Sequence, residues 1–274
     1  MPRVGVNGVE LFYEVGGDGD PLVLVHGSWG DHGNWAPVLH ALALRFRVLV
    51  YDRRGHSLSE RPPGQGSRFE DEEDLAALIE TLGFAPAYVA GNSFGASTAL
   101  GLAARRPELF RGLIAHEPPL MGIVADAPEL LPLMAATGEK IESVLAHLRA
   151  DQLLAGARQF VEEVALGPGV WDQLPEQLRE TFIVNAPTFM DEQADPEWAN
   201  LDLGRLSRYT GPALLTKGTE SPPWFATIIA RLSGALPEAE TYTFGGAGHI
   251  PHASHPDAYA RRVTSFIEGS NRPS

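Results

Sequence analysis

The pentapeptide GNSFG, residues 91–95, constrains the fold of this chain more than any other segment. Residues 87–91 before it are apolar, as in a buried strand, and residues 94–104 after it are rich in small side chains, as in a packed helix. A G-x-S-x-G sequence between a strand and a helix predicts a sharp turn, because only small neighbours leave room for a serine in a strained conformation. We therefore expect Ser93 to project from the sheet edge as a nucleophile. The alternative is that Ser93 only caps the helix.

Segments typical of strands and of helices alternate on both sides of this turn, which indicates a mostly parallel sheet covered by helices. Residues 4–6 and 9–13 predict an antiparallel hairpin at the edge, because Asn7-Gly8 favours a tight turn. A chain of 274 residues suits one such α/β domain or two small ones. Further strands are expected over 21–26, 46–51, 113–116, 213–217 and 240–244, and helices over 34–44, 70–82, 223–236 and 256–267.

The region 118–210 interrupts this alternation, because it contains no convincing strand pattern. Its amphipathic stretches predict helices over 139–149, 151–166 and 175–185. Prolines separate them, at positions 128, 132, 168, 175, 187 and 196. We interpret 118–210 as a helical cap domain inserted into a core domain that comprises 1–117 and 211–274.

A candidate general base, His249, follows the last predicted strand in the sequence GGAGHIP, residues 245–251. A serine hydroxyl is a weak nucleophile, and a histidine can take its proton near neutral pH. The preceding glycines allow this loop to bend across the sheet edge toward Ser93. The nearby His252 and His255 are interpreted as solvated loop residues.

A tetrahedral oxyanion needs two converging N–H donors. One is expected from the backbone of Phe94, the residue after the nucleophile. The other is expected from the backbone of Ser28, in the sequence HGSWG (26–30) that follows the predicted strand 21–26. His26 is interpreted as structural, with its ring bonded to the loop backbone.

These pieces, in this order, resemble the α/β-hydrolase superfamily. The segment DRRGHSLS, residues 52–59, also looks like the D-x-R-G-x-G-x-S turn of that family, with Ser57 where glycine is usual. The resemblance implies an eight-stranded sheet, a mobile cap and a Ser-acid-His triad. It also implies a serine branch, since the epoxide hydrolases and haloalkane dehalogenases of the family carry aspartate at the position of Ser93.

The acid of such a triad has two candidate positions in this sequence. Most family members carry an aspartate after the penultimate strand, where this chain has Ser221, with Glu220 one residue earlier. The second position follows the strand after the nucleophile helix, and here it holds Glu117, in the sequence HEPPL. Side chains at the carboxyl ends of parallel strands gather at one edge, and we favour Glu117, with Glu220 as the alternative. A buried ion pair with Arg111 is a purely structural interpretation of Glu117.

The Ser-Glu-His arrangement resembles zearalenone lactonases, in the His-Glu-x-Pro run and in the segment HIPHASHPD, residues 249–257. That resemblance implies hydrolysis of a carboxylic ester or lactone. The substrates it implies are hydrophobic and include a resorcylic-type macrolactone. Phe189 stands where this subgroup carries a substrate-facing tryptophan. Side chains that flank the catalytic segments or lie in the cap are expected to bind the substrate: Trp29, Leu120, Met121, Phe189, Trp224 and Ile250.

The composition excludes some classes of binding partner but leaves several alternative functions open. The formal net charge of −14 argues against nucleic acid and anionic membranes, and the absence of cysteine excludes thiolate catalysis. No cofactor and no metal are expected, the partner is a small-molecule ester or lactone, and a cytoplasmic location is the default without a signal-peptide pattern. The oligomeric state cannot be read from the sequence. Rival functions on the same fold are a C–C bond hydrolase or lyase, a ligand receptor with slow turnover, and a perhydrolase.

Overall fold

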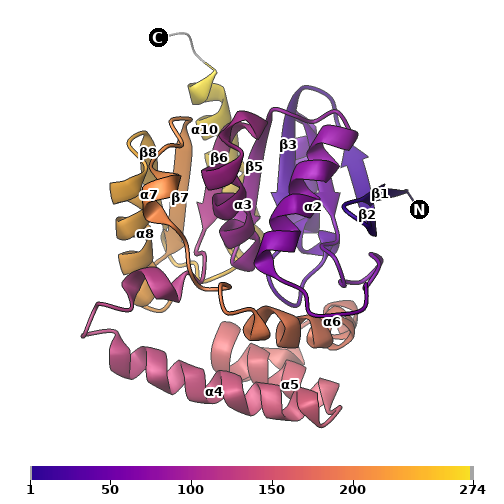
Figure 1. Cartoon of the computed structure of the whole chain (residues 1–274), viewed down its shortest axis with the longest axis vertical. Coiled ribbons are helices and arrows are strands. Elements are labelled where there is room, and N and C mark those ends of the chain that lie inside the picture. The colour runs from indigo at the N-terminus through magenta and orange to yellow at the C-terminus, as the bar shows by residue number, and fades with distance from the viewer. Residues whose placement is uncertain (1, 272–274) are drawn as a thin grey trace.

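A computed structural model describes residues 2–271 of the chain. Its centre is an eight-stranded sheet with the order β1-β2-β4-β3-β5-β6-β7-β8 (Figure 1). β2 runs antiparallel to β1 and β4, and the remaining neighbours are parallel. The strands are β1 (Arg3–Val6), β2 (Val9–Gly16), β3 (Asp20–Val25), β4 (Phe46–Tyr51), β5 (Ala87–Asn92), β6 (Phe110–His116), β7 (Ala213–Gly218) and β8 (Ala239–Phe244).

The predicted fold class is confirmed by this sheet, in which each of the eight expected strands is present. The edge hairpin turns at Asn7 and Gly8, which both have positive φ, 46° and 76°. β5 is buried along its whole length, because parallel strands on both sides and helices on both faces remove it from water. The central strand that leads to Ser93 is therefore the most enclosed part of the scaffold.

Helices cover both faces of the sheet and enclose two apolar clusters. One face packs against α2, α3 and α8, whose buried side chains join Val23, Val89 and Leu113 in one cluster. The other face packs against α1 and α10, around Leu24, Val48 and Ile114. These helices and the short turns around them are η1 (His32–Trp35), α1 (Ala36–Ala43), α2 (Arg68–Thr81), α3 (Phe94–Arg105), η2 (Pro107–Leu109), α8 (Trp224–Ala235), α9 (Pro251–Ser254) and α10 (Pro256–Ser270).

The segment between β6 and β7 is described throughout by the structure, and it contains helices and no strand. Its longer helices gather at one end of the sheet (Figure 1). Trp29 from the core joins their own apolar cluster, beside Val144, Trp171 and Phe189. The elements are η3 (Met121–Val124), α4 (Leu131–Arg149), α5 (Leu153–Gln159), η4 (Phe160–Ala165), η5 (Trp171–Gln173), α6 (Glu176–Ala194) and α7 (Leu203–Leu206).

Two helix predictions in this segment were wrong. The stretch 151–166 is not one helix, because α5 ends at Gln159 and continues as η4, a π-helical turn. π-Helical turns frequently occur at functional sites. Pro187 does not end a helix either, since it lies inside α6. A proline inside a helix costs roughly 3 kcal/mol, so contacts elsewhere along α6 must hold it in place. Among the described residues, no helix has both the length and the apolar character needed to cross a membrane.

Candidate active site

Ser93 lies in a strained turn between β5 and α3. Its backbone has φ 55° and ψ −125°, a conformation that residues other than glycine rarely adopt. The flanking glycines are required by packing: a Cβ on Gly91 would lie 2.4 Å from the Gly95 carbonyl oxygen, and one on Gly95 would lie 2.2 Å from the carbonyl oxygen of Val25. The turn thus has the strand-to-helix geometry expected of an exposed nucleophile.

Glu117 follows the last residue of β6 and is fully buried. Its φ is 45°, and its N–H donates to the carbonyl oxygen of Thr216 in β7, 3.2 Å away. The strand ends here because Pro118 and Pro119 come next and lack the N–H that a ladder needs. The chain therefore turns sharply at Glu117.

The carboxylate of Glu117 contacts His249 directly. Its Oε2 lies 2.7 Å from Nδ1 of His249, and its Oε1 accepts a 2.7 Å hydrogen bond from the N–H of Gly218. Burial would raise the pKa of Glu117, but the hydrogen bond and charge of His249, the His116 ring and the Gly218 N–H lower it to about 2. Glu117 is therefore ionised at neutral pH and can orient an imidazole ring.

His249 is held from several sides. The side-chain amide of Asn92, the residue before Ser93, donates to its carbonyl oxygen at 2.9 Å. The ring of Phe225 stacks on the imidazole at a centroid distance of 5.1 Å. Phe225 thus restrains the imidazole ring, and Asn92 ties the backbone of the loop after β8 to the end of β5.

The alternatives for the acid lie elsewhere. Glu220 is exposed, and its carboxylate accepts from the neighbouring Thr219 hydroxyl at 3.1 Å. Arg111 forms its ion pair with Asp20 near the opposite end of the strands, so the structural interpretation of a Glu117–Arg111 pair was wrong. The structure thus brings Glu117, and not Glu220, into contact with His249.

The loop after β3 carries Ser28, and His26 fixes its backbone. Nδ1 of His26 lies 2.8 Å from the carbonyl oxygen of Gly27, and Nε2 accepts from the N–H of Arg53 at 2.9 Å. Burial and the charge of Arg53 lower the pKa of His26 to about 3, so the ring is neutral. Because the Gly27 carbonyl is held by the ring, the N–H of the same peptide, which belongs to Ser28, is held as well.

Two cavities meet at Ser28, Ser93 and His249. One has a volume of about 160 Å³ and the other about 120 Å³. Phe160 and Ala165 of η4 line both cavities and so lie over their junction. A separate cavity of about 220 Å³ contains neither Ser93 nor His249 among its lining residues. We place the candidate active site at this junction, since Ser28, Ser93 and His249 line both cavities there.

The lining of the junction differs in part from the sequence prediction. The smaller cavity is lined by Phe94, Met121, Phe189 and Trp224. The larger cavity is lined by Ile250. Trp29 and Leu120 are fully buried and line neither cavity, because the Trp29 ring stacks under Phe160 and Leu120 packs into the core. His252 is buried against Trp35 and lines the larger cavity, so its interpretation as a solvated residue was wrong. Lining residues that the sequence patterns did not indicate include Asn34, Ile141, Phe160, Val164, Leu178, Phe182, Trp198 and Phe225.

A buried charge cluster lies next to the Ser28 loop. Arg53 is 1% exposed, and its guanidinium pairs with Asp71 of α2 at 2.9 Å and with Glu192 of α6. Two carboxylates thus share one cation. Burial raises the pKa of Asp71 from 3.8 to about 7, despite the opposing charge of Arg53, and Asp74 and Glu192 raise it further.

We expect the pH dependence of stability to report Asp71. The folded protein retains a proton that the unfolded chain releases above pH 3.8, so stability should fall as pH rises from about 4 to about 7. Asparagine at position 71 does not titrate, so the Asp71→Asn variant should lose less stability than the wild type between these two pH values. The difference in the free energy of unfolding, measured in urea, should be on the order of 2 to 4 kcal/mol. The exposed Asp18→Asn is the control and should keep the wild-type slope. An unchanged slope in Asp71→Asn would show that Asp71 is ionised throughout.

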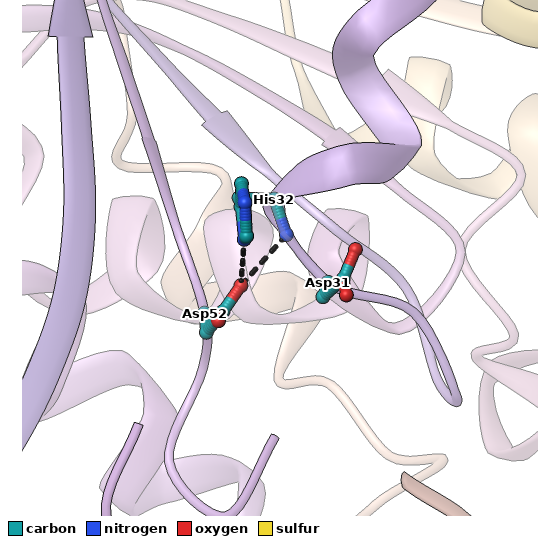
Figure 2. A group of neighbouring side chains, drawn as sticks. All are labelled: Asp31, His32 and Asp52. Atoms are coloured by element: carbon teal, nitrogen blue, oxygen red, sulfur yellow. Dashed lines mark hydrogen bonds and ion pairs between the residues drawn. The ribbon is translucent and has the colours of Figure 1, made fainter. Parts of the chain in front are cut away.

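A group of possible metal ligands, Asp31, His32 and Asp52, lies where η1 begins and β4 ends (Figure 2). The ring and the backbone N–H of His32 both meet the same Asp52 oxygen, at 2.6 and 2.8 Å, as Figure 2 shows. The other Asp52 oxygen accepts from the N–H of Leu58, and Asp31 accepts from Gly33 and from the hydroxyl of Ser57. Protein donors therefore already use these carboxylates, and the hydrogen bond to Asp52 raises the pKa of His32. We interpret the group as a brace for the start of η1.

Comparisons with known proteins agree with this fold. The model of the alpha/beta hydrolase family matches residues 22–262. A putative carbamate hydrolase, RutD, of Azorhizobium caulinodans is 36% identical over 97% of this chain and 98% of its own length. A 2-(acetamidomethylene)succinate hydrolase of Mesorhizobium japonicum is 26% identical over 97% of this chain and 94% of its own. Among solved structures, an alpha/beta hydrolase from Sphaerobacter thermophilus is similar with a TM-score of 0.78 and 26% identity, covering 97% of this chain and all of that one. The chain therefore belongs to the alpha/beta hydrolase family.

Proposed function

We propose that this protein is a serine hydrolase that cleaves a neutral carboxylic ester or lactone through Ser93, His249 and Glu117. The observation that carries the proposal is the 2.7 Å contact between the buried Glu117 carboxylate and Nδ1 of His249. It fixes the imidazole so that its other nitrogen, Nε2, faces away from Glu117. His249 and Ser93 line the same two cavities, so a substrate carbonyl at the junction would meet both groups.

In the first half of the reaction, Nε2 of His249 takes the proton of the Ser93 hydroxyl as the oxygen attacks the substrate carbonyl. Glu117 stabilises the imidazolium that results, as the acid of such a triad does. The N–H groups of Ser28 and Phe94 donate to the oxyanion, each contributing about 3 kcal/mol of transition-state stabilisation if they behave like known oxyanion donors. The intermediate collapses, and the leaving alkoxide receives the proton from His249.

In the second half, water attacks the acyl group on Ser93 and gives its proton to His249. Collapse of the second tetrahedral intermediate releases the acid and returns the proton to Ser93. Because the Ser93 oxygen forms a covalent bond to the acyl group, the acyl-enzyme is an obligatory intermediate of the proposed reaction. The helical segment 118–210 would act as the cap that sets substrate choice, because η4 and α6 contribute Phe160, Val164 and Phe189 to the walls.

The charge of the cavities favours a neutral substrate. Among the described residues that line the two cavities, none is lysine, arginine, aspartate or glutamate. A carboxylate bound there would be desolvated without a cation, which costs several kcal/mol. This would separate the chain from relatives such as the 2-(acetamidomethylene)succinate hydrolase, which is named for a dicarboxylate substrate. A neutral macrolactone of the resorcylic type would extend through both cavities, whose apolar walls include Phe160, Phe182, Phe189 and Trp224.

A matched pair of substrates tests the proposal. We expect p-nitrophenyl butyrate to be hydrolysed with a pre-steady-state burst of about one equivalent, because the acyl-enzyme accumulates with a good leaving group. The hemisuccinate p-nitrophenyl ester has nearly the same length but ends in a carboxylate, and its kcat/KM should be roughly 100-fold lower since the carboxylate finds no cation. A panel of neutral lactones and carbamate esters then ranks the leaving groups.

Other outcomes point to other functions of the same fold. Cleavage of a vinylogous 1,5-diketone with no ester turnover would contradict the ester proposal in favour of C–C bond hydrolysis. Ligand binding with negligible turnover would indicate a receptor, and peroxide-dependent halogenation without hydrolysis would indicate a perhydrolase. Equal rates for the butyrate and the hemisuccinate would refute the preference for neutral substrates while leaving the hydrolase intact.

A further inference from the structure

One face of α6 carries three buried polar side chains, two of which reach the residues that carry the proposed oxyanion donors. Asn185, Thr188 and Glu192 are spaced by three and four residues, so they lie on the same side of the helix. They are 0%, 4% and 6% exposed. Burying polar groups is unfavourable unless they find partners, and the partners here lie in the core domain, on the loops that carry the site.

Asn185 bonds to the loop that holds the proposed oxyanion donor. Its side-chain nitrogen donates to the carbonyl oxygens of Trp29 and Gly30, at 3.3 and 2.8 Å, and its oxygen accepts from the N–H of Ser57 at 2.7 Å. Trp29 has a φ of 65°, which is strained for a side chain of this size. One amide of α6 therefore stabilises the strained turn that immediately follows Ser28.

Glu192 reaches both proposed donor residues. The Ser28 hydroxyl lies close enough to this carboxylate to oppose the rise in the pKa of Glu192 that burial causes. The carboxylate also pairs with Arg53, whose guanidinium lies 4.6 Å from the centre of the Phe94 ring. A single buried ion pair thus contacts the two residues whose N–H groups are proposed to stabilise the oxyanion.

We propose that Asn185 and Glu192 are positioning residues, which set the oxyanion donors of Ser28 and Phe94 from the helical segment. The inference rests on the proposed function. Oxyanion donors act when they lie about 2.7–3.1 Å from the developing charge, and a displacement of about 1 Å can cost roughly 100-fold in rate. α6 would then be a fixed part of the catalytic architecture, and Asn185 would act through the backbone it holds.

The test is the variant Asn185→Ala, assayed with p-nitrophenyl butyrate and with phenylboronic acid. The boronate forms a tetrahedral adduct on Ser93 that places an oxygen at the oxyanion position, whereas KM reports mostly the unreacted ester. We expect kcat to fall by about 10- to 100-fold and the inhibition constant of the boronate to rise by a similar factor. KM should change by less than about threefold, because no cavity wall is removed.

Thr188→Val is the matched control. Thr188 lies on the same face of α6 and is equally buried, but its hydroxyl contacts His56 and its own helix, not the Ser28 loop. Its kcat should stay within about twofold of wild type even if the melting temperature drops. Equal losses of kcat in Asn185→Ala and Thr188→Val would overturn the inference, because the polar face would then only fasten the helix to the core.

A second variant keeps the inference testable if Asn185→Ala does not fold. Ser28→Ala removes the hydroxyl that contacts Glu192 and leaves the Ser28 N–H in place, and kcat should fall by about 5- to 10-fold with KM unchanged. An unchanged kcat would refute the role of Glu192. Absence of ester turnover in the wild type would refute the proposed function instead, while wild-type turnover with unaffected variants would refute only the positioning.

Discussion

Replacing Ser93 with alanine is expected to lower kcat for a neutral ester by about 10⁴- to 10⁶-fold, with KM nearly unchanged. The reason is that the hydroxyl is the proposed nucleophile, and removing one member of a triad abolishes the covalent route while oxyanion donors and substrate binding persist. The strained backbone at Ser93 accepts alanine, which has the same Cβ. A fluorophosphonate should add its mass to one peptide of the wild type, the one that contains Ser93, and to none in the variant.

Ser97→Ala provides the matched control for this experiment. Ser97 lies one turn further along α3, is fully buried, and its hydroxyl has no hydrogen-bond partner. The variant should keep wild-type kcat, because the lost hydroxyl faces the core and not the cavities. Retention of more than about a tenth of the activity in Ser93→Ala would contradict the nucleophile assignment and would direct attention to general-base attack by water.

Replacing Glu117 with glutamine should lower kcat by about 10³- to 10⁴-fold. Glutamine has the same shape and can still accept from the N–H of Gly218, so the loop after β7 should keep its position. It cannot stabilise an imidazolium as a carboxylate does, and its amide can hold His249 in the wrong tautomer. The measurement is kcat over a range of pH, with the melting temperature as a check on folding.

Glu220→Gln is the partner experiment, since Glu220 was the alternative acid. Its carboxylate is exposed and bonds to Thr219, so kcat should remain within about twofold of wild type. The opposite pattern, a large loss of kcat in Glu220→Gln and none in Glu117→Gln, would refute the proposed triad. A moderate loss of kcat in both variants would indicate that each carboxylate helps to hold the loop that carries the other.

The fold could be predicted in unusual detail because its signals are local. Buried parallel strands such as β4 are short apolar runs between turn residues, and each expected strand appears within a few residues of its predicted position. The helical segment was less predictable. The π-helical turn at η4 and the passage of α6 through Pro187 depend on tertiary contacts, among them those of Asn185 and Glu192, and no pattern within the segment encodes them.

In the candidate site, too, one part could be predicted from the sequence and another part could not. Ser93, His249 and Glu117 could be named because each follows a strand, and the ends of parallel strands meet at one edge. The lining could not, because it depends on how η4 and α6 fold over that edge. Trp29 illustrates the difficulty: it follows Ser28 directly, yet its positive φ turns the ring under Phe160 and away from the cavities.

The position of Glu117 immediately after β6 has a consequence for protein engineering. In the proposed triad the acid follows β6, so the turn after β7 carries no proposed catalytic group, although its Pro222 lines the smaller cavity. Residues 221–223 can therefore be varied to change which esters fit, whereas Thr219 and Glu220 form hydrogen bonds to the loop that carries His249. In a hydrolase whose acid stood on that turn, the same library would consist mostly of inactive proteins.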